Sequence, residues 1–187
     1  MTSSKIRQIT TMGILIAISI ILVVSPLRFP WPTAPFLVYE PGDVPIMIGG
    51  FVFGPIAGVV LTVITSVVQS LTVGKDGILG CVMHILSTSA LVGISAFIYL
   101  KKKTFKGAIL GCVIGSIAKT IVMGILNLAL DPIFYGMTLD AVIKLMFPAI
   151  LPFNFTKAAL NSIIFLIIFK SAGNILLKTA QRSREII

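Results

Sequence analysis

The sequence has few side chains that could carry out chemistry or hold a metal ion. It contains two cysteines and one histidine, and none of its six acidic residues lies within an apolar run. The absence of an intramembrane carboxylate disfavours a self-sufficient proton- or sodium-coupled carrier. There is no nucleophile–base pair or metal cluster, and Gly74-Lys75-Asp76-Gly77 lacks the spacing of a phosphate-binding loop. These absences disfavour an enzyme and indicate a binding protein that depends on energy supplied by another protein.

Apolar residues dominate instead. They make up 57% of the 187 residues, and the mean hydropathy is +1.08. A bilayer crossing needs about 20 mainly apolar residues, and several runs are that long. The runs are continuous rather than alternating, so they predict transmembrane helices and not a barrel. Cys81 and Cys112 lie inside such runs and are interpreted as small buried hydrophobic residues.

The first apolar run follows Lys5 and Arg7, as the apolar part of a signal peptide would. No small-x-small cleavage pattern comes after it, and further apolar runs follow. We therefore interpret it as a retained first helix.

The net charge of +9 is distributed unevenly. Nine of the fifteen basic residues fall in three clusters, whereas five of the six acids lie in the polar segments between them. Because basic residues mark cytoplasmic loops, the excess predicts membrane orientation and not a nucleic-acid-binding surface. The clusters are Lys5 and Arg7; Lys101, Lys102, Lys103 and Lys106; and Lys178, Arg182 and Arg184.

The run at 44–73 decides the number of spans. If it crossed once, the middle basic cluster would lie outside the cell. A hinge near Gly54-Pro55 would divide it into two short helices and return that cluster to the inside. The prediction is an all-α membrane protein with six transmembrane helices, both termini cytoplasmic, and one substrate-binding domain over 1–187. The predicted spans are about 9–25, 44–54, 56–73, 77–100, 107–130 and 151–177.

Two polar residues stand at the start of the last span, in the sequence Pro152-Phe153-Asn154-Phe155-Thr156-Lys157. Asn154 and Lys157 are three residues apart and therefore share a helix face. Ionisable groups at membrane depth usually face a bundle interior and are functional candidates. The alternative is that Lys157 extends along its aliphatic stem to the membrane surface.

Asn127 is expected at a similar depth, near the outer end of the fifth span. Three polar side chains from two helices thus converge beneath two long outer segments, 26–43 and 131–150, which predicts a ligand pocket. Long loops on one side of a bundle are often lids or binding loops. The alternative for the aromatic residues of 26–43, Trp31 above all, is an interfacial belt.

The chemistry of these residues suggests a class of ligand. An asparagine amide matches the edge of a flat lactam or pyrimidine-like ring, and a lysine donates to carbonyl or hydroxyl oxygens. Phe36, Tyr39, Phe153 and Phe155 offer surfaces for a planar face. A flat heterocycle with one polar edge therefore fits better than an ion or a lipid. The alternative for the asparagines is hydrogen bonding between helices, which is our interpretation of Asn161.

Other polar residues carry weaker predictions. His84 follows the Lys75-Asp76 loop by about two turns and is expected either to line the same cavity or to form hydrogen bonds within the bundle. Together with Cys81 it does not make a metal site. Lys119, near mid-membrane, has no identifiable partner in the sequence.

The sequence Glu40-Pro41-Gly42-Asp43-Val44-Pro45 predicts a turn leading into a helix. Asp43 is expected to be the N-cap of that helix, and Glu40 is a candidate ligand contact. In the first span, Gly13 and Ala17 form a small-xxx-small pair, which allows another helix to approach closely.

The stretch Phe36-Leu37-Val38-Tyr39-Glu40-Pro41-Gly42-Asp43-Val44-Pro45, followed by the glycine-rich segment 49–58, resembles the substrate-binding (S) components of energy-coupling factor (ECF) vitamin transporters. The sequence at 152–157 is similar to that of their riboflavin-specific branch. The resemblance covers nearly the whole chain in length and span order.

This resemblance implies a multi-pass protein of the bacterial cell membrane that captures riboflavin from outside with high affinity, without a cofactor. It implies docking on a transmembrane scaffold protein through Gly13 and Ala17, with ATP hydrolysed by two ABC ATPase partners. The loop around Phe36 to Tyr39 would close over the site. The residues expected to contact substrate are Asn127, Asn154, Lys157, Phe36, Leu37, Tyr39, Glu40 and His84.

Three alternatives remain open from the residues themselves. The ligand could be another planar vitamin, such as a pterin or pyrimidine precursor. The chain could be an intramembrane enzyme that uses His84 or Cys81, or a purely structural subunit in which Asn154 and Lys157 tolerate alanine.

Overall fold

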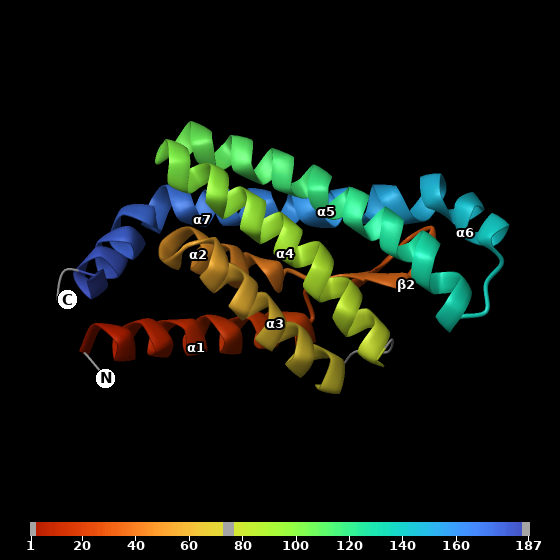
Figure 1. The fold of residues 1–187 in the computed structure, drawn as a ribbon, viewed down its shortest axis with the longest axis horizontal. Coiled ribbons are helices and arrows are strands. Elements are labelled where there is room, and N and C mark those ends of the chain that lie inside the picture. The colour runs from red at the N-terminus through yellow and green to blue at the C-terminus, as the bar shows by residue number, and fades with distance from the viewer. Residues whose placement is uncertain (1–2, 73–76, 185–187) are drawn as a thin grey trace.

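The computed structural model describes residues 3–72 and 77–184, and helices form most of it (Figure 1). The Lys75-Asp76 loop lies outside the described residues. In chain order the elements are α1 (Ser3–Val24), β1 (Phe29–Trp31), β2 (Ala34–Tyr39), α2 (Asp43–Phe53), α3 (Pro55–Thr72), α4 (Gly77–Lys102), α5 (Phe105–Phe134), α6 (Leu139–Leu145), the π-helical turn η1 (Met146–Ile150) and α7 (Leu151–Arg184).

Within the described residues, five helical segments are long and apolar enough to cross a membrane. They are α1, α3, α4, α5 and the run of α6, η1 and α7. Helix α2 is equally apolar but has 11 residues, so it extends only about 16 Å of a hydrocarbon core of about 30 Å. The predicted all-α membrane architecture is confirmed, with five full-length helical segments and one short helix.

The predicted break between α2 and α3 is present at Gly54. This residue has φ of +104°, a backbone angle that residues with a Cβ rarely adopt. Pro55 then begins α3. The turn brings the two helices together so closely that a Cβ on Gly58 would lie 3.0 Å from the Cα of Gly50.

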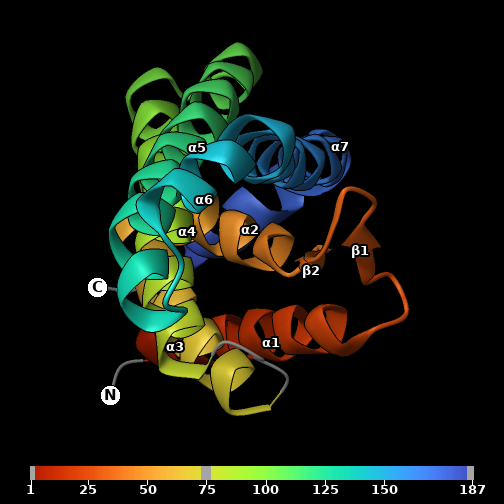
Figure 2. The same ribbon diagram turned by 90° about the vertical axis from the view of Figure 1, so that its right-hand side faces the viewer.

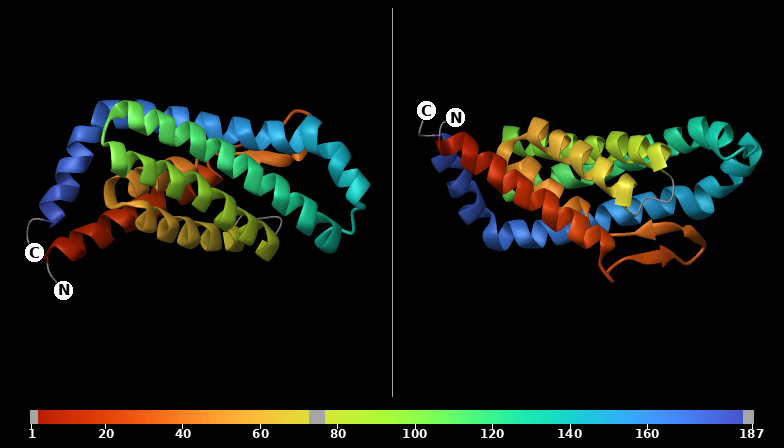
Figure 3. Two further views of the ribbon diagram at one scale, coloured as in Figure 1. Left: turned by 45° about the horizontal axis from the view of Figure 1, so that its top comes forward. Right: turned by 90° about the horizontal axis from the view of Figure 1, so that it is seen from below.

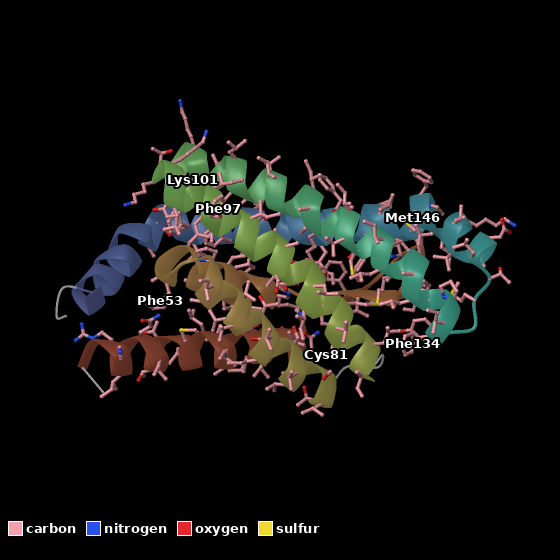
Figure 4. All side chains as sticks on the ribbon, viewed as in Figure 1. Phe53, Cys81, Phe97, Lys101, Phe134 and Met146 are labelled. Carbon is pink, nitrogen blue, oxygen red and sulfur yellow. The ribbon has the colours of Figure 1, made fainter. Side chains whose placement is uncertain are left out.

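The two ends of the bundle differ. The beginning of α1 and the end of α7 lie at one end, and the β-strands and α6 lie toward the other (Figures 1 and 3). Lys101, in the middle basic cluster, is at the same end as the termini (Figure 4). This arrangement agrees with the charge pattern, while the orientation in the membrane stays a prediction.

The segment 26–43, expected to be a structured loop, contains a two-stranded antiparallel hairpin. Phe29 pairs with Tyr39, and the register is interrupted between Pro30 and Trp31. Both strands are edge strands, where proline is tolerated because one side of the backbone needs no ladder hydrogen bond. Trp31 packs edge-on against Phe153 at 5.7 Å, which places the hairpin against the start of α7.

Helix α2 lies in the middle of the bundle, packed against α1, α3, α4 and α7 (Figure 2). Its Phe51 contacts Tyr99 of α4 and Phe165 and Phe169 of α7, with ring centroids 4.4–5.4 Å apart. This aromatic cluster fills the half of the bundle nearer the termini and fixes the position of α2, which begins at the polar site described below.

Helices α4 and α5 approach closely at two glycines. A Cβ on Gly111 would lie 2.6 Å from the carbonyl oxygen of Ser95, and one on Gly115 would lie 2.6 Å from that of Leu91. We expect Gly111→Ala to lower the free energy of unfolding by about 1–3 kcal/mol, because a backbone carbonyl cannot move aside. This loss exceeds the gain in helix propensity of about 1 kcal/mol.

Thermal unfolding in detergent measures this effect. The matched control is Gly13→Ala on α1, where an added Cβ meets nothing within 4 Å. Equal melting temperatures for the two variants would show that the glycines do not set the α4–α5 distance.

Candidate functional site

A cavity of about 490 Å³ lies in the half of the bundle nearer the hairpin. Its walls come from β2, α3, α4, α5, the α6–η1 segment and α7. This volume falls in the range of small-molecule sites. Figure 4 shows the side chains around this half, with Cys81, Phe134 and Met146 labelled.

Seven of the eight residues predicted to contact ligand line this cavity. Tyr39 does not; its side chain is buried to one side of it. The seven are Asn127, Asn154, Lys157, Phe36, Leu37, Glu40 and His84.

Lys157 is held inside the bundle by an ion pair. Its ammonium donates to Oε1 of Glu40, and the two side chains are 10% and 6% exposed. The aromatic ring of Phe153 lies one turn earlier, 5.9 Å from Nζ. The alternative that Lys157 extends to the membrane surface is therefore wrong in this structure.

A second buried ion pair lies beside the cavity. Lys119 of α5 donates to Oδ2 of Asp43 and, at 2.9 Å, to the hydroxyl of Thr88. His84 Nε2 lies 3.2 Å from the other carboxylate oxygen of Asp43. One side chain at the start of α2 thus connects α2 to α4 and α5.

The prediction that Asp43 is the N-cap of this helix is wrong. Gly42 holds the cap position without a side-chain hydrogen bond, and Asp43 is the first helical residue. Its carboxylate is 2% exposed and pairs with Lys119, because a buried charge is costly without a counter-charge. Sequence reasoning left Lys119 without a partner, although a buried lysine signals that a carboxylate is near.

Each of the two cavity asparagines forms one side-chain hydrogen bond to a backbone carbonyl four residues earlier in the chain. Asn127 donates to the carbonyl of Met123 at 2.7 Å, and Asn154 donates to that of Ile150 at 2.8 Å. Each bond uses one N–H of the amide. Within the described residues, no hydrogen bond is found for the second N–H or the side-chain carbonyl of either amide.

Asn161 has another role. It donates to the backbone carbonyl of Glu40 at 3.3 Å and lies 3.4 Å from Oδ2 of Asp43, while its own oxygen accepts from the Tyr39 hydroxyl at 2.9 Å. Burial raises the pKa of Tyr39, and the charges of Asp43 and Glu40 add to the effect, so the hydroxyl stays protonated and donates. Asn161 and Tyr39 therefore fix the end of the hairpin to α7.

The electrostatics indicate the kind of ligand that the cavity suits. Lys119 and Lys157 both line it, and each is paired with a buried carboxylate. The two pairs carry no net charge, and the other charged side chains of the lining, Arg28 and Asp131, are one of each sign, so the site has no excess of either charge. This favours an uncharged molecule, since a charged ligand would need an unpaired counter-charge.

Comparison with known proteins gives the family. Residues 7–169 match the sequence profile described as ECF transporter, substrate-specific component. This chain belongs to that family. Its relatives are transporters and not enzymes, and it is a multi-pass protein of the bacterial plasma membrane.

Several relatives are similar over most of their length. The riboflavin transporter FmnP of Bacillus subtilis (strain 168) is 30% identical over 175 residues, covering 88% of this S component and 91% of the relative. The riboflavin transporter RibU of Staphylococcus aureus (strain TCH60) is 29% identical, with coverages of 91% and 92%. RibU of Lactococcus lactis subsp. cremoris (strain NZ9000) is also 29% identical.

The fold agrees with the sequence comparison. A solved structure described as the S component of a bacterial ECF transporter superposes with a TM-score of 0.79 and 29% identity. The match covers 92% of this chain and 98% of the other. The ECF S-component fold expected from the sequence is therefore confirmed.

Proposed function

We propose that this S component binds riboflavin in the cavity and takes part in its import. The observation that carries the proposal is the polar edge, without net charge, formed by Asn127, Asn154 and the Glu40-paired Lys157. Similarity to riboflavin transporters over about nine-tenths of both chains supports it.

The chemistry of the ring fits that edge. Isoalloxazine is flat and uncharged, and its pyrimidine edge carries carbonyl oxygens, a ring nitrogen acceptor and an N–H donor. The asparagine amides offer both donors and acceptors, and Lys157 has N–H groups beyond the one directed to Glu40. Phe36 and Leu37 from β2 supply apolar surface beside it.

A competition titration tests the choice of vitamin. Riboflavin fluorescence is followed as purified protein is added, alone and with an excess of a pterin or of a pyrimidine precursor. We expect saturable quenching that neither competitor relieves. If one competitor reduces the quenching, the site binds that vitamin instead, which is the alternative that the sequence left open.

We further propose that riboflavin enters from the hairpin side, facing the cell exterior, and that both termini are cytoplasmic. The placement of Lys101 at the terminal end of the bundle supports this orientation. Transport would require a transmembrane scaffold and two ABC ATPases, as membership of the ECF transporter substrate-specific family implies.

The surface of α1 around Gly13 and Ala17 is the proposed contact with the scaffold. Both residues are exposed, and nothing lies within 4 Å of a Cβ added at Gly13. We expect Gly13→Leu to abolish most riboflavin uptake in cells that contain the energising module, while the purified variant still binds riboflavin.

The matched control is Ala129→Leu, which enlarges an exposed small residue on α5. It should leave both uptake and binding unchanged. Loss of binding in a folded Gly13→Leu protein, or normal uptake by cells that carry it, would rule out this docking surface.

A further inference from the structure

The turn between α4 and α5 carries a dense cluster of basic side chains. Four of the six residues from 101 to 106 are lysines, and all four are exposed. Lys101 and Lys102 end α4, Lys103 lies in the turn, and Lys106 is in the first turn of α5. These four side chains are called the lysine patch below.

The lysine patch has no acidic partner within the described residues. The ion pairs found there all involve other basic side chains. The carboxylates of this part of the chain lie in or beside the cavity or on α6; they are Glu40, Asp43, Asp131 and Asp140. The patch therefore carries positive charge that these carboxylates do not neutralise.

One lysine of the patch has a backbone conformation that glycine adopts at lower cost. Among the described residues, Lys103 is the one non-glycine residue with a positive φ, of +46°. Its N–H donates to the carbonyl of Tyr99 at 2.7 Å and so ends α4. Glycine is favoured at such a helix end because it has no Cβ. A lysine in its place points to a role for the side chain.

Apolar side chains flank the lysine patch on the same two helices. Phe97 of α4 is 50% exposed, and Phe105 and Ile109 of α5 are also exposed. Both helices are long and apolar enough to cross a membrane, so their exposed apolar side chains face lipid. The lysines at the ends of these helices therefore lie at the level of the lipid headgroups.

Two of the lysines pack their aliphatic stems on the helices. Nζ of Lys101 lies 4.5 Å from the centre of the Phe97 ring, and Figure 4 labels both residues at this end of the bundle. The stem of Lys102 lies on the start of α5, where a Cβ on Gly107 would be 2.6 Å from the Lys102 Cβ. Side chains packed in this way hold their ammonium groups among the headgroups.

We propose that the lysine patch binds anionic phospholipid headgroups, such as that of phosphatidylglycerol, in preference to zwitterionic ones. Phosphatidylglycerol carries one net negative charge, whereas the quaternary ammonium of phosphatidylcholine cancels the charge of its phosphate. Each lysine close to an anionic lipid surface strengthens binding about fivefold. This selection among lipids is independent of riboflavin, and it goes beyond the orientation rule, which concerns only the side of the membrane.

A tryptophan placed beside the patch measures the preference. Trp31 is the only tryptophan of the chain, so Trp31→Phe/Phe97→Trp leaves a single indole next to Lys101. The protein is reconstituted in phosphatidylcholine vesicles that contain increasing fractions of dibrominated phosphatidylglycerol or dibrominated phosphatidylcholine, whose bromines quench nearby tryptophan.

We expect the relative binding constant to favour phosphatidylglycerol by about fivefold or more at about 0.1 M salt. It should approach one at about 1 M salt, because the Debye length falls from about 10 Å to about 3 Å. A preference that salt does not reduce would contradict an electrostatic site.

Two variants in this reporter background test the lysines themselves. Replacing all four by glutamine should abolish the preference for phosphatidylglycerol, and replacing all four by arginine, which keeps the charge, should preserve it. The side chains are exposed, so both proteins should unfold at the temperature of the parent. The glutamine variant is Lys101→Gln/Lys102→Gln/Lys103→Gln/Lys106→Gln.

The matched control moves the reporter along α5, away from the patch. Ile125 is 60% exposed, and Trp31→Phe/Ile125→Trp should be quenched equally by the two brominated lipids.

Each other outcome overturns the lipid site. Equal quenching of the Phe97→Trp reporter by both lipids would show that the patch does not select anionic headgroups. A preference that persists in the glutamine variant would belong to other residues, and an equal preference at Ile125 would be general to the protein surface. If no lipid preference exists but the glutamine variant fails to support uptake, the patch contacts a protein of the energising module instead.

Discussion

Replacing Lys119 by methionine is expected to destabilise the protein by about 3–5 kcal/mol, because it leaves Asp43 as a buried charge without its lysine. The effect should lie at the lower end of that range, since His84 and Asn161 still face the carboxylate. Thermal unfolding in detergent measures it. We expect Lys119→Met/Asp43→Asn to recover a large part of the loss, since no unpaired charge then remains.

The chain offers a matched control in the pair Lys144–Asp140 of α6, whose side chains are 75% and 72% exposed. Lys144→Met should change the free energy of unfolding by no more than about 1 kcal/mol. Equal effects at Lys119 and Lys144 would contradict the view that the Asp43 pair is a buried structural element.

Lys157→Met is expected to weaken riboflavin binding by about thirtyfold or more. Truncating one member of a buried, hydrogen-bonded charge pair at a binding site costs about 2–5 kcal/mol. Because this change also leaves Glu40 unpaired, the informative variant is Lys157→Met/Glu40→Gln. It should fold with near wild-type stability and still fail to bind riboflavin tightly.

Lys170→Met is the control on the same helix, since Lys170 is exposed and outside the cavity lining. It should bind riboflavin as the wild type does. Tight riboflavin binding by the Lys157 double variant would mean that the lysine has only a structural role. Lys157 would then not belong to the polar edge that contacts the ring.

The turn Glu40–Asp43 connects the cavity to the rest of the bundle. Glu40 and Asp43 pair with lysines of α7 and α5, and Ser19 of α1 donates to the carbonyl of Gly42 at 2.5 Å. A Cβ on Gly42 would lie 2.5 Å from a methyl carbon of Val23. The helix proposed to contact the scaffold is thus packed directly against a turn that borders the ligand cavity.

The membrane helices were predictable because their signal is local. Long apolar runs, a glycine–proline hinge at 54–55 and clustered lysines are each visible in a short stretch of sequence. Asn154 and Lys157, which line the cavity, were singled out for the same reason: polar groups three residues apart at the start of an apolar run are conspicuous.

The pairing of charges was not predictable by the same means. Asp43 and Lys119 are 76 residues apart, and the turn sequence around Asp43 reads equally well as a helix cap. Tyr39 looked like a ligand contact because it is aromatic and near Phe36, yet its hydroxyl is used by Asn161. The hairpin was missed since its prolines indicate a loop, and only tertiary packing against α7 decides otherwise.

The absorption spectrum of the purified wild-type protein, equilibrated with riboflavin and freed of unbound ligand, tests most directly whether the cavity holds this vitamin. We predict the visible bands of an oxidised flavin in stoichiometric amount, and their loss in the Lys157→Met/Glu40→Gln protein. A folded wild-type protein that retains no flavin, or a double variant that retains as much as the wild type, would contradict riboflavin binding at this site.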